Sequence, residues 1–172
     1  MTTGRLDPNH CEILLKTEHV GRLGCHAAGR TYIVPVTYVF DDGAIYGHTN
    51  PGLKLEMLRS NPSVCFEVDH LDNMANWRSV VAWGQFEELS GRAKADALDL
   101  LFRRLTPVIR SQTSLPTKGA LPGARAPDLT TGPMQEPTAD QVLGGIKANG
   151  TLGVVYRIKV SEMSGRYETG VH

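Results

Sequence analysis

A β-hairpin signal in the first third of the chain constrains the fold most. The segment TYIVPVTYVF (31–40) is rich in β-branched and aromatic residues, the turn residues DDG follow it, and AIYGHT (44–49) runs back. Such residues favour strands, and glycine permits the tight reversal between them. Pro35 has no N–H to donate, so we expect this part of the strand to lie at an edge, a bulge or an opening of the sheet. A gap there would leave main-chain groups available to a ligand.

Four further segments carry strand patterns. Three of them are HVGRLGCHAA (19–28), SVCFEVDH (63–70) and WRSVVAWGQFEEL (77–89). The fourth, TLGVVYRIKVSEMSGRY (151–167), has an apolar residue at every second position from Val154 to Val160, the clearest strand pattern in the chain. About six strands joined by short turns predict a mainly β (α+β) fold, an antiparallel barrel rather than a sandwich or a doubly wound sheet.

A few helices are expected around this barrel. Asp7 and Pro8 suit the start of a helix over residues 8–16, because the aspartate can cap free N–H groups and proline fits the first position. A short helix follows Gly52, and apolar residues recur at helical spacing between residues 91 and 104. These three segments predict short or amphipathic helices at the periphery of the barrel.

Residues 111–137 are rich in proline, glycine and threonine and show no apolar period. We therefore expect a long loop, carried by a single domain that spans residues 1–172. Irregular segments of this length are usually functional or disordered. The loop is either a lid over a ligand or an unconstrained surface loop.

Charge and cysteine content exclude several classes of protein. Lys plus Arg and Asp plus Glu number 18 each, so no overall positive field would gather nucleic acid or anionic lipid. The three cysteines are far apart and form no C-x-x-C pair, which argues against a disulfide scaffold and a zinc site. No membrane-spanning or signal-peptide segment is visible. We expect a cytoplasmic protein that binds no nucleic acid, no membrane and no metal.

The turn HTNPGLK (48–54) is the first candidate for a ligand site. The chain has neither the G-x-G-x-x-G motif of dinucleotide-binding sites after a strand nor the phosphate-binding loop of nucleotide hydrolases. In this turn, however, Gly52 permits a ligand to approach the backbone closely, and the helix that follows directs free N–H groups outward. Lys54 adds a full positive charge there, an arrangement that suits a phosphate. The alternative is an ordinary solvated lysine.

Two residues of the segment NWRSVV could add to such a site. Arg78 offers a planar guanidinium and Ser79 a hydroxyl, and both are good phosphate partners. If Arg78 and Lys54 converge, two cations meet one dianion. The alternative is that Arg78 pairs with Glu67 or Asp69 on a neighbouring strand.

The ordered segments of residues 10–90, from HVGRLGCHAAGRTYIVPVTYVF through AIYGHTNPGLKLEML to WRSVVAWGQFEEL, resemble the pyridoxamine 5′-phosphate oxidase-like superfamily of FMN-binding split β-barrels. They are most similar to its nitroimidazole-resistance (Nim-type) reductase branch. The resemblance implies a six-stranded antiparallel split barrel and a homodimer that binds FMN at the subunit interface.

The resemblance also implies roles for individual residues. Val34, Pro35, Val36 and Thr37 would follow the edge of the flavin ring. His48 and Thr49 would lie beside the ring and its ribityl chain, Lys54 would meet the phosphate, and Arg78 and Ser79 would complete the phosphate end. In the Nim-type branch the histidine at the position of His48 lies close to the flavin, which makes it the candidate catalytic residue. A structural histidine is the alternative.

Two departures argue against vitamin B6 oxidation. Tyr32 and Thr37 occupy the positions where true pyridoxamine-phosphate oxidases have basic residues, and SGRYETGVH (164–172) does not supply their substrate-binding Arg and His. We therefore expect an FMN-dependent oxidoreductase, with NADH or NADPH as donor, that reduces a small electron-poor molecule such as a nitroaromatic or a quinone. The alternatives are a haem-binding or haem-degrading split barrel and a non-catalytic flavin or deazaflavin module.

Overall fold

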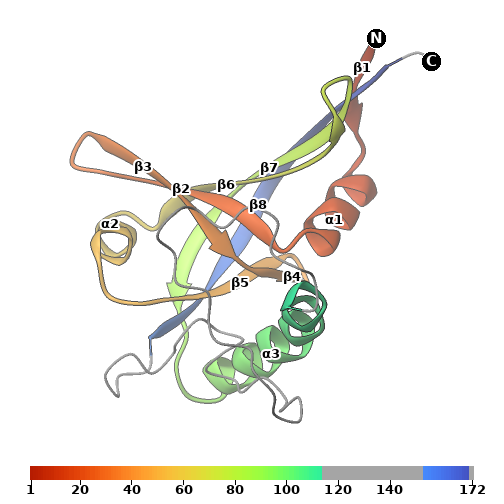
Figure 1. Cartoon of the computed structure of the whole chain (residues 1–172). Coiled ribbons are helices and arrows are strands. Elements are labelled where there is room, and N and C mark those ends of the chain that lie inside the picture. The colour runs from red at the N-terminus through yellow and green to blue at the C-terminus, as the bar shows by residue number, and fades with distance from the viewer. Residues whose placement is uncertain (114–152, 171–172) are drawn as a thin grey trace, which may run out of the picture.

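A computed structural model describes residues 1–113 and 153–170. Within these residues a single antiparallel sheet of eight strands, which differ in length, curves around the main core (Figure 1). The strands are β1 (Thr2–Leu6), β2 (Val20–Ala27), β3 (Arg30–Thr37), β4 (Val39–Asp41), β5 (Ala44–Thr49), β6 (Ser63–Asn73), β7 (Asn76–Glu88) and β8 (Val154–Thr169).

The sheet does not close into a complete barrel. Its strand order is β3-β2-β6-β7-β8-β5-β4, and β1 pairs with β8 outside this path. The two end strands, β3 and β4, do not pair with each other although they are neighbours in the chain. The predicted antiparallel split barrel is therefore confirmed, with eight strands in the described residues where about six were expected.

The predicted hairpin is only partly correct. β4 and β5 form it around the turn at Asp42 and Gly43, as expected. The segment 31–37, however, belongs to a separate strand, β3, which pairs with β2 at the other end of the sheet. The chain changes sheet edge at Tyr38, whose N–H donates to the carbonyl of His19 (3.1 Å).

Tyr38 anchors this crossing in the core. Its hydroxyl donates to the carbonyl of Leu15 (2.9 Å), and its ring packs edge-on against Phe66 with centroids 4.8 Å apart. The side chain is completely buried. Because its N–H and hydroxyl both have partners, this buried tyrosine can join the two edges without an unpaired polar group.

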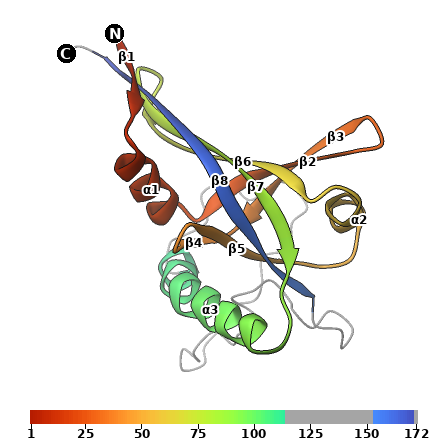
Figure 2. The same cartoon turned by 180° about the vertical axis from the view of Figure 1, so that it is seen from behind.

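In the described residues three helices accompany the sheet. Figures 1 and 2 show their arrangement from opposite sides. α1 (Pro8–Thr17) starts as predicted, with the Asp7 carboxylate accepting from the N–H of His10 (2.9 Å). α2 (Leu53–Ser60) lies near β2. α3 (Gly91–Thr113) is longer than the predicted helix over 91–104 and includes the start of the predicted loop. The rest of that loop, 114–137, lies outside the described residues.

Among the described side chains, two apolar clusters hold these elements together. The main cluster fills the inside of the curved sheet and includes Leu23, Phe66, Tyr156 and Ile158. A smaller cluster joins α3 to β4, β5 and β8 on the other face. Strand alternation explains the division, because neighbouring residues of β8 point to opposite faces and each face is covered.

Strand β1 was not predicted. Its sequence TTGRL has no apolar alternation, and only its pairing with β8 (Thr2 opposite Thr169) makes it a strand. The N-terminal strand β1 and the last residues of β8 consequently lie side by side at one end of the sheet (Figure 1). Among the described helices none is long and apolar enough to cross a membrane.

Candidate functional site

The open edge of β3 provides main-chain hydrogen-bonding groups. This strand pairs with β2 on one side only, so its other edge has no partner strand within the described chain. Pro35 lies opposite Arg22 in this pair, at an edge position that tolerates the missing N–H. Of the edge, bulge or opening that the sequence predicted, the segment Val34–Thr37 therefore forms an edge.

At the end of β5, His48 and Thr49 point to opposite faces of the sheet. Thr49 is buried, and its hydroxyl donates to the carbonyl of Asn50 (3.1 Å). His48 lies opposite Val155 and is half-buried on the face that α3 covers. Only one of the two side chains can therefore face a given ligand directly.

Lys54 lies in the first turn of α2, and its side chain is half-buried. No hydrogen bond or ion pair joins it to any acidic residue in the part of the chain that the structure describes. Burial lowers the pKa of Lys54, although the adjacent Cys25 thiol opposes this effect. The helix start is also uncapped, because Gly52 at the N-cap has no side chain to accept from the free N–H groups.

Electrostatic effects on neighbouring groups show what surrounds the Lys54 ammonium. Two effects lower the pKa of His48: burial, which is the larger, and the charge of Lys54. This imidazole is therefore neutral at pH 7. Burial raises the pKa of the Cys25 thiol more than Lys54 lowers it. The ammonium is thus flanked by two uncharged groups. A positive charge in this setting, beside an uncapped helix start, suits an anionic ligand.

Arg78 does not approach Lys54 within one chain. Cys25, the neighbour of Lys54, pairs with Val64 of β6. Val64 in turn pairs with Gly84 of β7. Arg78 is six residues away from Gly84 along the same strand. At the rise of an extended strand this separation is roughly 20 Å. The expected convergence of two cations on one phosphate therefore does not occur in a single subunit.

Arg78 instead faces Asp72 on the adjacent strand β6 (4.0 Å). The residue that pairs with Glu67 (3.2 Å) and Asp69 is Arg22, on β2. Arg78 therefore forms an ion pair with a carboxylate of β6, as the alternative interpretation expected, but the partner is Asp72 rather than Glu67 or Asp69. Ser79 points to the opposite face of the sheet from Arg78, opposite Asp69.

The outer face of the sheet carries an apolar groove of about 620 Å³. A row across four strands forms its floor, made of Ile33, Gly24, Cys65 and Trp83, which lie opposite one another in register. Ile33 is 65% exposed and Trp83 is 41% exposed. Large apolar side chains exposed together on one sheet face are typical of a binding surface.

Two of these features could not be predicted from the sequence. Cys25 lies beside Lys54 only because α2 packs against β2. The apolar row depends on the register of three strand pairs. Both features arise from pairing between distant segments, which residue types do not encode locally.

Comparisons with known proteins agree with this architecture. The family model described as pyridoxamine 5′-phosphate oxidase matches residues 7–132. An uncharacterised protein of Rhizobium meliloti (strain 1021) is 33% identical over 79 residues, which are 46% of this chain. The match spans about half (52%) of that relative's length.

Solved structures with the same fold cover nearly the whole chain. An FAD-binding protein from Mesorhizobium loti is 27% identical with a TM-score of 0.65, and the alignment covers 98% of this chain and 100% of that one. A candidate 5-nitroimidazole antibiotic resistance protein from Bacteroides thetaiotaomicron has a TM-score of 0.62 at 18% identity, over 96% of this chain and 87% of that one. Because the family model matches well over half of the residues, this chain belongs to the pyridoxamine 5′-phosphate oxidase family of split barrels.

Proposed function

We propose that the protein is a flavin-dependent oxidoreductase that binds FMN at the open edge of its barrel. The observation that carries this proposal is the half-buried Lys54, which has no acidic partner in the described residues and lies at an uncapped helix start. A phosphate monoester would supply the missing negative charge and accept from the free N–H groups. The similarity to an FAD-binding protein from Mesorhizobium loti supports a flavin as the ligand that carries this phosphate.

The open edge of β3 suits the remainder of such a ligand. Cys25 lies opposite Tyr32, so the Lys54 end of the site lies level with Tyr32. Val36 is four residues further along β3, roughly 13 Å away in an extended strand. A phosphate at Lys54 would thus leave the flavin ring beside Val34–Thr37, where unpaired main-chain groups can bind its polar edge.

When bound, the flavin supplies the redox chemistry, and the protein supplies binding and orientation. His48 stays neutral at pH 7 because burial and Lys54 lower its pKa. A neutral imidazole can donate one hydrogen bond and accept another, so His48 acts by positioning the substrate rather than by carrying a positive charge. We infer that NADH or NADPH is the donor and that the acceptor is a small electron-poor molecule such as a nitroaromatic or a quinone.

We further propose that the working unit is a homodimer with the cofactor at the interface. The apolar row of Ile33, Gly24, Cys65 and Trp83 continues from the exposed edge strand β3 across the outer face. A second copy that covers this groove would bury exposed apolar surface beside the edge at which we place the flavin ring. Arg78 and Ser79 could reach a phosphate only from such a second copy.

The purified protein tests the cofactor directly. We expect a yellow protein with two flavin absorption bands and FMN as the released small molecule by mass spectrometry. An intense Soret band would instead favour the haem-binding alternative. Bound flavin that NADH and NADPH fail to reduce in stopped-flow measurements would favour a non-catalytic flavin module.

Two lysine variants test the site. Lys54→Ala should lose FMN, whereas Lys94→Ala on α3 should retain it, because Lys94 is a half-buried lysine on another element with no acidic partner among the described residues. Calorimetric titration of FMN into both apoproteins measures the effect. Equal FMN affinity of Lys54→Ala and wild type would refute the proposed site.

A further inference from the structure

Within one subunit, a second cavity lies away from Lys54, between α1 and the ends of β6, β7 and β8. Its volume is about 420 Å³, within the range of small-molecule sites. Leu6, Leu14 and Tyr167 form part of its apolar wall. Ile13 also lines it and is 50% exposed, so apolar surface remains uncovered at the entrance.

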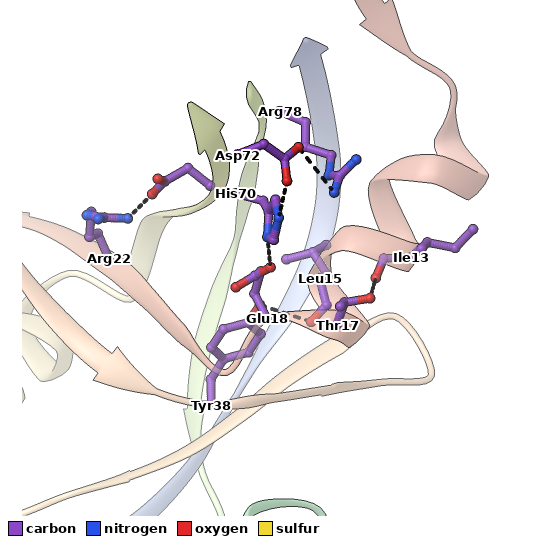
Figure 3. Close-up of polar contacts among 10 residues, drawn as sticks. Ile13, Leu15, Thr17, Glu18, Arg22, Tyr38, His70, Asp72 and Arg78 are labelled. Atoms are coloured by element: carbon purple, nitrogen blue, oxygen red, sulfur yellow. Dashed lines mark hydrogen bonds and ion pairs between the residues drawn. The ribbon is translucent and has the colours of Figure 1, made fainter. Parts of the chain in front are cut away.

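A chain of four charged or titratable side chains forms the polar side of this cavity (Figure 3). Glu18 Oε1 lies 2.7 Å from His70 Nδ1, and His70 Nε2 lies 3.2 Å from Asp72 Oδ1. Asp72 Oδ2 in turn lies 4.0 Å from Arg78 Nη2. The imidazole therefore bridges two carboxylates, one from the end of α1 and one from β6.

The lining carries more negative than positive charge. Three carboxylates, those of Glu18, Asp72 and Glu168, face a single permanent cation, Arg78. The indole N–H of Trp77 donates to Glu168 (3.2 Å) but brings no charge. His10 and His70 are the titratable bases of the lining, and His10 already contacts Asp7 (2.7 Å). Within residues 1–113 and 153–170 no group of His, Cys, Asp or Glu is arranged to hold a metal ion.

We propose that this cavity binds a small organic cation, an amine with an aromatic or aliphatic body. The ammonium group would lie at the polar side, with Glu18 and Asp72, and its apolar body would cover Ile13 and Leu14. Trp77 and Tyr167 offer aromatic rings, which attract cations in addition to their apolar contact. The excess of carboxylates selects a cation over an anion of the same shape.

His70 sets the pH dependence of this site. Its hydrogen bonds to Glu18 and Asp72 raise its pKa, while the charge of Arg78 opposes this effect. A protonated His70 therefore competes with an ammonium ligand for the same two carboxylates. As pH rises and His70 loses its proton, affinity for the cation increases.

Three probes of similar shape and different charge test the proposal on the full-length protein as purified. These are 2-phenylethylammonium, the neutral 2-phenylethanol and the anionic 3-phenylpropanoate. Calorimetry measures affinity, and the NMR shift of the Trp77 indole N–H reports the location. We expect the ammonium to bind about fivefold more tightly than the alcohol, as for a partly exposed charge pair. The anion should bind most weakly.

A matched pair of variants completes the test. Glu18→Gln should reduce ammonium affinity to that of the alcohol, whereas Glu162→Gln on the exposed part of β8 should leave it unchanged. Both changes keep the side-chain shape, and circular dichroism verifies folding. The proposal is overturned if no probe binds saturably, if the anion binds as tightly as the ammonium, or if both variants act alike. None of these outcomes depends on whether the flavin proposal holds.

Discussion

The two polar regions of this molecule differ in how their charges are neutralised. At the start of α2, the half-buried Lys54 has no acidic partner among the described residues, and its neighbours His48 and Cys25 are uncharged. Beside α1, His70 contacts two carboxylates, and Arg78 faces one of them. The first region holds an uncompensated charge, and the second is almost balanced.

This difference predicts what each region gains from a ligand. An anion at Lys54 supplies a negative charge that the described residues do not provide there. Its charge-assisted hydrogen bond to Lys54 replaces no existing ion pair and therefore contributes fully to the binding free energy. A cation in the cavity beside α1 replaces interactions that His70 already makes, so only the small charge excess favours it. We therefore expect tight cofactor binding at the first region and weaker, pH-dependent binding at the second.

Charge reversal at Lys54 should have the largest effect. In Lys54→Glu the new carboxylate would repel a phosphate at the start of α2, and we expect FMN affinity to fall by about 100-fold or more. Fluorescence titration of the apoprotein with FMN measures this loss. Lys94→Glu on α3 is the control, and a similar loss in that variant would mean that the effect is not local.

Removal of the Lys54 charge should weaken FMN binding but stabilise the apoprotein against unfolding. The folded protein partly desolvates this ammonium without providing a counter-charge. Lys54→Met keeps the length of the side chain and removes the charge, so we expect the apoprotein to gain about 1 kcal/mol of unfolding free energy. Urea unfolding of both apoproteins measures the difference. A loss of stability would indicate that Lys54 makes a favourable contact in the free protein.

Most of the fold could be predicted because strand patterns are local. Period-2 alternation located β8, and Pro35 restricted its strand to an edge, a bulge or an opening of the sheet, of which the structure has the edge. The division of 31–40 into β3 and β4 could not be predicted, because it depends on contacts of Tyr38 with His19 and Leu15. Local residue types do not show such long-range pairing.

The candidate site shows the same limit. Glycine and lysine at the start of a helix pointed to Lys54 from seven consecutive residues, and the structure finds this lysine without an acidic partner in the described chain. The expected meeting of Lys54 with Arg78 required the register of β2, β6 and β7, which separates them. Local chemistry was therefore predictable, whereas the distance between two sites in one subunit was not.

The smallest expected effect is a pH dependence of stability that His70 confers. Its hydrogen bonds to Glu18 and Asp72 raise the pKa of His70 in the folded state. Its stabilising contribution is therefore fully present below the unfolded pKa of about 6.5 and is lost as pH rises through the higher folded value. His70→Gln should be less stable than wild type at pH 5.5, and this difference should shrink by pH 9 in thermal unfolding. His26→Gln is the control, because His26 contacts the hydroxyl of Thr31 and forms no ion pair with a carboxylate of residues 1–113 or 153–170. A difference between His70→Gln and wild type that does not change with pH would show that the imidazole acts by packing alone. The His70 region would then not contain the stabilising charge contacts that distinguish it from the Lys54 region.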